Sequence, residues 1–356
     1  LPDPIATLDL AALGTVCDVA PLTGFNRAIV AQGLKILGQK RNPGLTALAA
    51  VAGRADSATV YDLGFVLGPR LNAGGRIGEA NLATQLLIAD AAEDAARLAD
   101  RLHTLNAERR QIEADIVNEA VALAEGDPRP VVVVGARHWH PGVIGIVAGR
   151  LKERLRKPVI VLGSAAPDEP AKGSGRSITG VNLGKAVAAA AREGLLMAGG
   201  GHAMAAGLTM DWAKVEPFQD FLAEVLCRET QDSAEEARAL SIDALAAPGA
   251  VTLSLVDALE RIGPFGAGHP DPVLALSSVR VKFAKRVGEN HLRLTLEDSR
   301  GKGVRGIAFN CANEPIGEAL QTRDAVVHVA VRVKRNSYQG NESAEVELVD
   351  AAPASL

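Results

Sequence analysis

The sequence contains few of the residues that usually mark a specialised site or a secreted protein. Aromatic residues make up only 3% of its 356 residues, so its cores must consist of aliphatic side chains. The three cysteines, Cys17, Cys227 and Cys311, lie far apart, which favours a reducing cytoplasm and argues against a zinc site. No apolar run approaches the ~18 residues of a membrane span, and no signal peptide is visible.

Charge is also unremarkable over the whole chain. The formal net charge is −4, and 47% of the residues are hydrophobic, which is typical of a globular protein and gives no indication of a nucleic-acid binder. The length predicts two or three domains of ~100–200 residues each. Because the chain begins at Leu1 rather than Met and enters an apolar pattern at once, we expect an N-terminal part to be missing.

The first third of the chain shows apolar patterns that predict the end of an α/β unit. Residues 8–22 are almost entirely apolar and predict a strand that ends near Asp18, and residues 26–37 predict an amphipathic helix. Residues 67–80 are rich in glycine and arginine and predict a loop. Residues 93–125 lack proline and glycine and predict one long helix, which either joins two domains along a groove or packs against an ordinary core.

Strand and helix patterns alternate in the middle of the chain, which predicts a sheet covered by helices. The polar residues 164–177 predict a loop between two of these elements. The alternating strands and helices are expected at 131–134, 142–155, 159–163, 182–192, 207–210 and 215–228.

After Asp271 the apolar residues recur with period two. About five short segments with glycine-containing turns predict a small β-barrel, for which an OB-fold is the best match. The expected fold class is therefore α/β with a C-terminal barrel. The expected parts are the end of an α/β unit, connecting helices, a second α/β domain and the barrel, at 1–78, 79–125, 126–232 and 233–356.

Asp18 is the candidate metal ligand. A carboxylate at the end of an apolar strand is costly unless it binds a cation or a hydrogen-bond donor, and carboxylates suit Mg²⁺ or Mn²⁺. A solvated cap is the alternative. One carboxylate cannot form a metal site, so the remaining ligands would have to lie outside this sequence.

Two glycine-rich stretches have the composition of an anion clamp. "PRLNAGGR" contains Arg70, Asn72 and Arg76, and "KGSGRS" contains Ser174 and Arg176. Guanidinium groups, a hydroxyl and exposed backbone N–H groups together suit phosphate oxygens. Either stretch alone could also be a plain turn.

Histidines next to glycines form a third candidate. In "GGGHAMAAG" the backbone of Gly200 and Gly201 lies at the expected start of a short helix, where an anion can bind, and His202 could donate to a phosphate or a base. "HWHPG" places His140 in a similar arrangement. A capping or core histidine is the alternative in each case.

The barrel segment carries a local excess of positive charge. Eight Lys and Arg lie between Val279 and Arg305 and face only three acidic residues nearby in sequence. A basic face on an OB-like barrel could follow a single-stranded backbone, whereas a solvated face is the alternative. The residues expected at this face include Lys282, Lys285, Arg286 and Arg305, with Phe283, Phe309 and Tyr338 available for stacking on bases.

In this order, the motifs resemble the RecJ family of the DHH phosphoesterase superfamily. "ALGTVCDVAPL" and "RLNAGGR" resemble the end of the DHH domain, "WHPGVIGIVAGRL", "KGSGRS" and "GGGHAMAAG" resemble the DHH-associated domain, and "GPFGAGHPDP" resembles the entry to the RecJ OB-fold. The resemblance implies that Asp18 ligates metal and that Arg76, Ser174 and Arg176 hold a 5′-phosphate. It also implies that His202 faces the scissile region.

The resemblance implies a Mn²⁺- or Mg²⁺-dependent exonuclease that degrades single-stranded DNA from the 5′ end in recombination and repair. We expect the chain to be a monomer that is inactive alone, and by family analogy it could meet a single-strand-binding protein and a helicase. The alternatives are a DHH phosphodiesterase of short oligonucleotides or cyclic dinucleotides, and an inactive DNA-binding scaffold.

Overall fold

The computed structural model describes residues 3–54, 58–236, 240–322, 324–338 and 340–354. These residues form two compact units, each made from segments that are distant in sequence. The first unit contains Leu1–Gly38, Ala58–Leu63 and Leu240–Leu356, and the second contains Gln39–Ser57 and Gly64–Ala239. None of the helices in the described residues is both long and apolar enough to span a membrane.

The second unit begins with helices α3 (Pro43–Val51), α4 (Gly68–Ile77), α5 (Leu82–Leu87) and α6 (Ala92–Ala124). The 33-residue α6 confirms the predicted long helix. The loop predicted over 67–80 was wrong, because most of it is α4. Its glycines permit close packing: a Cβ on Gly74 would lie 3.3 Å from Leu102 of α6, and one on Gly78 would lie 2.9 Å from Leu105.

A five-stranded sheet completes this unit, with the strand order β1-β2-β3-β5-β4. Only β1 and β2 are parallel; the other pairs are antiparallel. The strands are β1 (Val132–Gly135), β2 (Val159–Gly163), β3 (Ala171–Arg176), β4 (Ala198–His202) and β5 (Ala205–Met210). The helices are α7 (Ile144–Leu155), α8 (Leu183–Arg192) and α9 (Val215–Glu236), with a short 3₁₀ turn, η3, at Trp212–Lys214.

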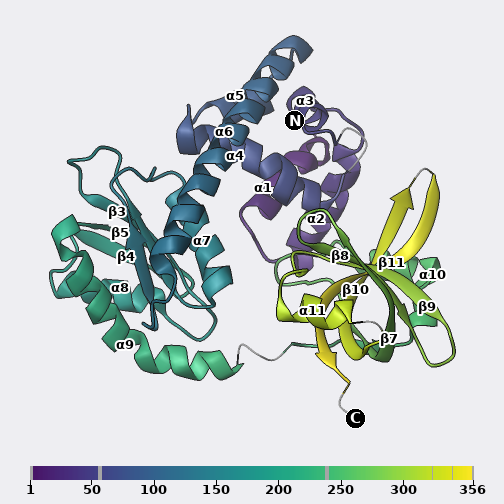
Figure 1. Cartoon of the computed structure of the whole chain (residues 1–356). Helices are drawn as coiled ribbons and strands as arrows, with labels where there is room; N and C mark the ends of the chain where they lie inside the picture. Colours follow the sequence, from purple (N-terminus) through teal and green to yellow (C-terminus); the bar gives the residue numbers. More distant parts are fainter. Residues whose placement is uncertain (1–2, 55–57, 237–239, 323, 339, 355–356) are drawn as a thin grey trace. The chain divides into compact units, whose positions relative to one another are not determined.

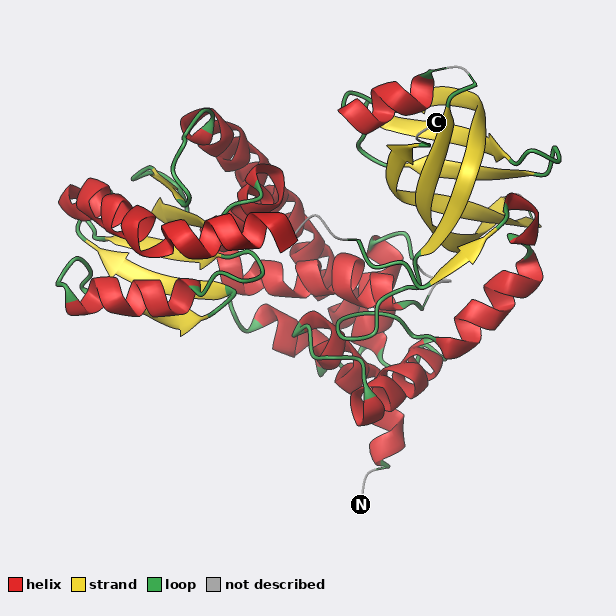
Figure 2. Ribbon diagram, turned by 90° about the horizontal axis from the view of Figure 1, so that it is seen from below, coloured by secondary structure: helices red, strands yellow, loops and turns green. Residues whose placement is uncertain are grey.

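Helices lie on both sides of this sheet, as Figures 1 and 2 show. The face that carries Ile160 and Leu208 packs against α8 and α9 in one apolar cluster. The face that carries Val159 and Val161 packs against α6 and α7 in another. The predicted arrangement of a sheet with helices packed on it is therefore confirmed.

Two local predictions in the sheet were wrong. "KGSGRS" was expected to be a loop but forms β3, and "GGGHAMAAG" was expected to open a helix but forms the β4–β5 hairpin. The glycines of β3 make room for leucines on the helix-covered face: a Cβ on Gly173 would lie 2.6 Å from Leu208, and one on Gly175 would lie 2.7 Å from Leu183. Tertiary packing thus overrides the low strand propensity of glycine.

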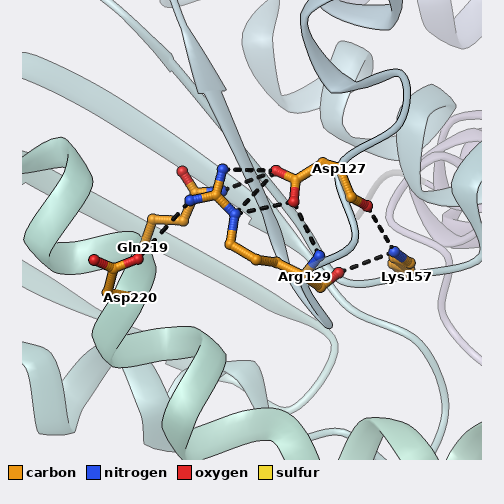
Figure 3. A network of polar contacts seen from close by, with 5 residues as sticks. All are labelled: Asp127, Arg129, Lys157, Gln219 and Asp220. Carbon is orange, nitrogen blue, oxygen red and sulfur yellow. Dashed lines mark hydrogen bonds and ion pairs between the residues drawn. The ribbon is translucent and has the colours of Figure 1, made fainter.

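A polar network fixes the loop between α6 and β1 (Figure 3). Asp127 accepts hydrogen bonds from the backbone N–H and the guanidinium of Arg129 and from Nε2 of Gln219 on α9. Lys157 donates to the backbone carbonyls of Asp127 and Arg129, while Asp220 lies 3.9 Å from the Arg129 guanidinium. The network ties the starts of β1 and β2 to α9.

The first unit begins with a 3₁₀ turn, η1 (Pro4–Thr7), followed by α1 (Leu8–Cys17) and α2 (Gly24–Leu37). The strand predicted to end near Asp18 was wrong, because the segment is α1 and Asp18 is its C-cap residue. An apolar run without clear period fits both a strand and a helix in close contact with another helix. The contact here is close: a Cβ on Gly33 of α2 would lie 2.4 Å from Ala12.

The rest of this unit is a closed barrel, and the predicted five-stranded OB-like fold is confirmed. Its strands are β7 (Leu274–Val287), β8 (His291–Glu297), β9 (Gly303–Ala308), β10 (Val326–Tyr338) and β11 (Asn341–Pro353), and pairing of β10 with β7 closes it. Around it lie β6 (Ala244–Ala246), η4 (Pro248–Ala250), α10 (Leu253–Ile262) and α11 (Pro315–Gln321).

The segment Asp62–Leu67 forms a π-helical turn, η2, where the chain passes from the first unit to the second.

The motif "GPFGAGHPDP" joins α10 to the barrel and packs on the N-terminal helices of the same unit. The backbone N–H of Leu22 donates to the carbonyl of Ala267 at 2.6 Å. Arg27 of α2 donates to the carbonyls of Ile262 and Gly263. This segment therefore fixes the stretch that follows Asp18.

Candidate nucleic-acid interface

One face of the sheet is left open over strands β3, β5 and β4. Strand register places three cross-strand rows on this face, because residues directly opposite one another share a face. The rows are Lys172–Thr209–Ala198, Ser174–Gly207–Gly200 and Arg176–Ala205–His202. A cationic column on β3 thus borders a floor of small residues, with His202 at the opposite corner. We call these nine residues the open face.

Two of its glycines are not required by the fold. A Cβ on Gly200 or on Gly207 would meet nothing within 4 Å, and neither residue has a positive φ angle. Gly201 is different, since its φ is +156° and a Cβ would lie 2.3 Å from the Ala205 carbonyl oxygen. A glycine that the fold does not need inside a strand is typical of a place where a ligand approaches the backbone closely.

Ser174 and Arg176 lie against the first turn of α7. Arg176 Nη1 donates to Ser174 Oγ at 3.1 Å and to the Gly175 carbonyl at 2.8 Å. A Cβ on Gly145 would lie 3.0 Å from Ser174 Oγ and 3.3 Å from Arg176 Nη2. Half-burial of the Arg176 guanidinium lowers its pKa. The geometry presents a hydroxyl and a guanidinium side by side next to a helix N-terminus.

Arg76 reaches the same region from the end of α4. Its Nη1 donates to the Gly142 carbonyl at 3.0 Å, immediately before α7. Burial lowers the pKa of Arg76 most, and the nearby positive charges of Arg109 and Arg176 lower it further, while Glu113 raises it. Arg76 and Arg176, which are a hundred residues apart in sequence, therefore contribute charge to one location.

A buried ion network on α6 supports Arg76. Arg109 Nη1 donates to Glu113 at 2.6 Å, and Arg109 Nη2 donates to Asn106 at 3.2 Å. Arg150 of α7 donates to the other Glu113 oxygen at 3.3 Å. Arg109 Nε, which is buried, has no hydrogen-bond partner within the described part of the chain. The Glu113 carboxylate thus accepts hydrogen bonds from Arg109 and Arg150 and interacts with Arg76 at longer range. With three arginines and one carboxylate, the cluster keeps an excess of positive charge.

The two candidate histidines are both exposed. His202 ends β4, beside the hairpin tip that packs on the start of α8. His140 Nδ1 accepts the backbone N–H of Gly142 at 3.0 Å. In neutral His140 this bond leaves the ring proton on Nε2, where it can be donated outward.

Arg70 and Asn72 lie elsewhere on α4. Arg70 donates to the Val66 carbonyl at 2.7 Å and from Nε to His103 Nδ1 at 3.3 Å, and burial followed by the charge of Arg110 lowers its pKa. Asn72 is exposed. Arg70 is therefore held by the preceding π-helical turn η2 and by α6, and a phosphate-binding role for either residue stays a prediction.

The described residues do not gather a metal site around Asp18. Asp18 is an exposed side chain, and no group of three or more His, Cys, Asp or Glu in the described part of the chain is arranged to hold a metal ion. Asp18 can therefore be one ligand at most, and these residues alone do not fit a Mn²⁺ or Mg²⁺ ion.

On the barrel, several of the predicted basic residues have partners. Lys282 pairs with Glu297 at 2.9 Å, Arg305 with Glu345 at 3.5 Å, and Arg286 donates to Asn313 and to the Ala312 carbonyl. Glu297 is one of the three acidic residues already counted near the basic cluster, whereas Glu345, which is distant in sequence, reduces the expected charge further.

The remaining basic face is concentrated on β7 and β8. Lys285 lies directly opposite Arg293, and both are exposed. Phe283 and Phe309 are 49% and 50% exposed and are available for stacking. The side chain of Tyr338 lies outside the described residues.

Four charged residues in or beside these sites were not predicted from the sequence: Arg109, Glu113, Arg150 and Lys172. The alternation Lys-Gly-Ser-Gly-Arg could have placed Lys172 beside Ser174 and Arg176, since residues two apart on a strand share a face. The spacing of Arg109 and Glu113, four residues on a predicted helix, could have identified their ion pair. Arg150 carries no comparable signal.

Comparison with known families agrees with this arrangement. A model described as the DHHA1 domain matches residues 129–227, which contain the open face. A model described as the RecJ OB domain matches residues 242–350, which contain the barrel. These ranges fall within the third and fourth of the expected parts, although the four boundaries themselves stay predictions.

Curated relatives carry the same name. The single-stranded-DNA-specific exonuclease RecJ of Escherichia coli is 36% identical over 97% of this chain and 61% of its own length. The Thermus thermophilus protein of that name is 34% identical over 98% of this chain and 48% of its own length. The chain thus spans about three fifths or less of these relatives.

Solved structures extend the match to the fold. The crystal structure of RecJ in complex with Mn²⁺ from Thermus thermophilus aligns with a TM-score of 0.82 and 32% identity, covering 100% of this chain and 51% of that chain. The Mg²⁺ complex of the same protein aligns equally well. Both family models match, and the similarity runs along nearly the whole chain, so the chain resembles the corresponding part of the RecJ proteins.

Proposed function

We propose that the chain is the phosphate-binding and strand-binding part of a metal-dependent exonuclease that degrades single-stranded DNA from the 5′ end. The main support is the open face, where strand register aligns Ser174, Arg176 and His202 beside two glycines that the fold does not require. The named activity of the relatives supports the same substrate class.

Arg76, Ser174 and Arg176 are proposed to bind the terminal 5′-phosphate. Its extra negative charge and third free oxygen suit two guanidinium groups and a hydroxyl. The partial burial of both arginines strengthens their attraction for an anion, because the local dielectric is lower than in water. A strand end held in this way would present the next phosphodiester to the small-residue floor.

His202 is proposed to donate a hydrogen bond near the scissile phosphate. Gly200 and Gly207 lie in the adjacent row and leave the backbone bare. The DNA backbone could therefore approach the sheet, while the imidazole adds a directed donor without negative charge. His140, exposed at the border of the sheet, is proposed as a further backbone contact.

The Mn²⁺ or Mg²⁺ requirement rests on the relatives, whose structures are complexes with these ions. Such ions activate water and stabilise the charge of a phosphodiester transition state. We propose that Asp18 contributes one ligand and that the other ligands lie outside the described residues. A monomeric state, a cytoplasmic location, and contacts with a single-strand-binding protein and a helicase stay proposals from family analogy.

A phosphodiesterase for very short or cyclic oligonucleotides is less well supported. The closed barrel offers a basic outer surface on β7 and β8, which a substrate of two nucleotides would not need. This surface instead suits a longer single strand.

Binding and hydrolysis by the purified 356-residue chain test the proposal. In chelator, we expect it to bind 5′-phosphorylated oligo(dT) in a salt-dependent manner, and with Mn²⁺ to release no nucleotides. Fusion to the remaining N-terminal part of the Escherichia coli relative should restore release of nucleotides from the 5′ end. Absence of binding at low salt, or release from the 3′ end, would contradict the proposal.

A further inference from the structure

Lys172 occupies the third position of the cationic column on β3. It lies two residues from Ser174 and four from Arg176, so the three side chains share the open face. At ~3.3 Å per residue, the Cα atoms of Lys172 and Arg176 are about 13 Å apart along the strand. The two side chains also have different partners, since Arg176 donates to Ser174 whereas Lys172 donates to Thr209 on β5, so Lys172 is placed to contact a different phosphate.

The surroundings of Lys172 leave its charge available. Its Nζ donates to Thr209 Oγ1 at 3.2 Å, and the side chain is exposed. Within the described residues it has no carboxylate at ion-pair distance. An ammonium group has three protons, and a single hydroxyl uses one of them.

The floor beside Lys172 is also accessible. In the neighbouring row, Gly207 and Gly200 have open space where a side chain would be. On the other side Lys172 pairs with Gly163, whose Cα lies against the carbonyl of Trp139. A DNA strand could therefore extend along the open face from Arg176, past the bare backbone of Gly207 and Gly200, to Lys172. The loop that carries His140 lies next to the Lys172 end of this path.

We propose that Lys172 binds an internal phosphate of the DNA strand whose 5′-phosphate is bound by Arg76, Ser174 and Arg176. The inference rests on the proposed function. The chemistry of the residues matches the two ligands: paired guanidinium groups suit a terminal phosphate with three free oxygens, and a single ammonium suits a singly charged phosphodiester. Lys172 would therefore increase the affinity for the strand without distinguishing a 5′-phosphate from a 5′-hydroxyl.

The test compares Lys172→Gln with Lys185→Gln. Lys185 is an exposed lysine on α8, which covers the opposite face of the sheet, so it is a matched control for the lost charge. Binding of fluorescent 5′-phosphate and 5′-hydroxyl dT₁₂ to the full chain is measured in chelator between about 50 and 200 mM salt, a range in which one contact changes affinity measurably.

Let K be the association constant for the oligonucleotide. The slope of log K against log salt is negative, and Lys172→Gln should make it less steep by about 0.7 for both oligonucleotides, as expected for one lost phosphate contact on a single strand. The ratio of the wild-type affinity to the Lys172→Gln affinity should therefore fall about 2.6-fold when salt is raised from about 50 to 200 mM. The ratio of the affinities for the two 5′ ends should not change. Lys185→Gln should leave slope and ratio as they are.

Two outcomes would overturn the inference: a slope for Lys172→Gln equal to that of Lys185→Gln, or a changed ratio for the two 5′ ends. Failure of the proposed end clamp has a different signature. In that case Arg176→Ala would leave the 5′-end ratio unchanged while Lys172→Gln still reduced the salt slope. If the wild-type chain fails to bind either oligonucleotide at low salt, both proposals are wrong.

Discussion

Arg176 on β3 and His202 on β4 are both paired with Ala205 on β5, so they lie in one cross-strand row, two strands apart. At ~4.8 Å per strand, their Cα atoms are separated by about 10 Å, which is wide enough to place a phosphate-bearing group between their side chains. The sequence separates these residues by a whole helix. Their roles should nevertheless be distinguishable, because only Arg176 lies beside Ser174.

Arg176→Ala should lower the preference for a 5′-phosphate over a 5′-hydroxyl. A lost charged hydrogen bond is worth ~1.5–3 kcal/mol, or roughly ten- to a hundredfold in that ratio. His202→Ala should slow both substrates by a similar factor, since it is proposed to face the scissile phosphate. The measurement is kcat/KM of the restored fusion enzyme on oligonucleotides that differ only at the 5′ end. Equal losses on both substrates for Arg176→Ala would refute the end clamp.

Gly200→Val and Gly207→Val should fold normally and still weaken DNA binding. An added Cβ at either position meets no protein atom within 4 Å, and valine favours a strand over glycine, so the melting temperature should stay the same or rise. The side chains would instead occupy the floor of the open face. Gly201→Val is the contrasting variant, because its positive φ and its contact with Ala205 should destabilise the protein. Undiminished DNA affinity in both floor variants would show that no ligand approaches there.

Glu113→Gln should strongly destabilise the second unit. The change leaves Arg109 buried without its counter-ion and removes the carboxylate shared with Arg150. Removing one partner of a buried ion pair typically costs about 3–5 kcal/mol. Glu108→Gln, an exposed position on the same helix, should have little effect on the free energy of unfolding measured by urea titration. A similar small effect for both variants would show that the Glu113 cluster is well solvated.

Asp127 should make the second unit sensitive to acid. The hydrogen bonds and charge of Arg129 hold the pKa of Asp127 below its ordinary value of about 3.8. Because the folded pKa is depressed, the carboxylate stabilises the fold above the unfolded pKa, and this contribution is lost as the pH falls through the folded pKa. Asp127→Asn should therefore lower the melting temperature at pH ~7, and its difference from the wild type should narrow towards pH ~3.

Asp220→Asn is the matched control for this prediction. Asp220 belongs to the same network but is 70% exposed and 3.9 Å from the Arg129 guanidinium. Asp220→Asn should change the melting temperature little at both pH ~7 and pH ~3, because exposed ion pairs contribute little to stability. If the difference between Asp127→Asn and the wild type stays constant with pH, the Asp127 carboxylate does not control the acid response.

The sequence predicted the fold class, the long α6 helix, the second α/β domain and the barrel, because these depend on periodic apolar patterns. The predictions were wrong where glycine-rich segments form a helix or a strand. "RLNAGGR" and "KGSGRS" were expected to be loops, but their glycines allow α4 to approach α6 and β3 to accept leucines from its neighbours. Glycine composition alone does not distinguish a turn from close packing.

Most of the candidate site residues could be named from the sequence, but their grouping could not. Arg76 and Arg176 come together only through α7, and Lys172 joins the open face only through the register of β3 with β5. Glu345, the partner of Arg305, lies on β11 and was absent from the local charge count, so that count exaggerated the free basic surface. Burial of Arg109 and Glu113 depends on helix packing, which no local pattern specifies.

The barrel offers a prediction in which stability and binding change in opposite directions. Lys285 on β7 lies directly opposite Arg293 on β8, and both are exposed. Like charges in directly opposite positions destabilise a sheet, and cross-strand pairs are worth ~0.2–1 kcal/mol. A fold selected only for stability gains nothing from this pair, whereas a surface that binds a DNA backbone does.

Lys285→Glu should therefore raise the stability of the barrel by a few tenths to ~1 kcal/mol, because it creates an attractive pair with Arg293. The same change should weaken binding to single-stranded DNA and reduce the magnitude of the salt slope by at least about 0.7. Lys285→Glu/Arg293→Glu completes the cycle: it restores like-charge repulsion, so the stability gain should disappear, while DNA binding should fall further. Urea unfolding and fluorescence anisotropy on the full chain measure the two quantities. If Lys285→Glu leaves DNA affinity and salt slope unchanged, this part of the barrel is a solvated face.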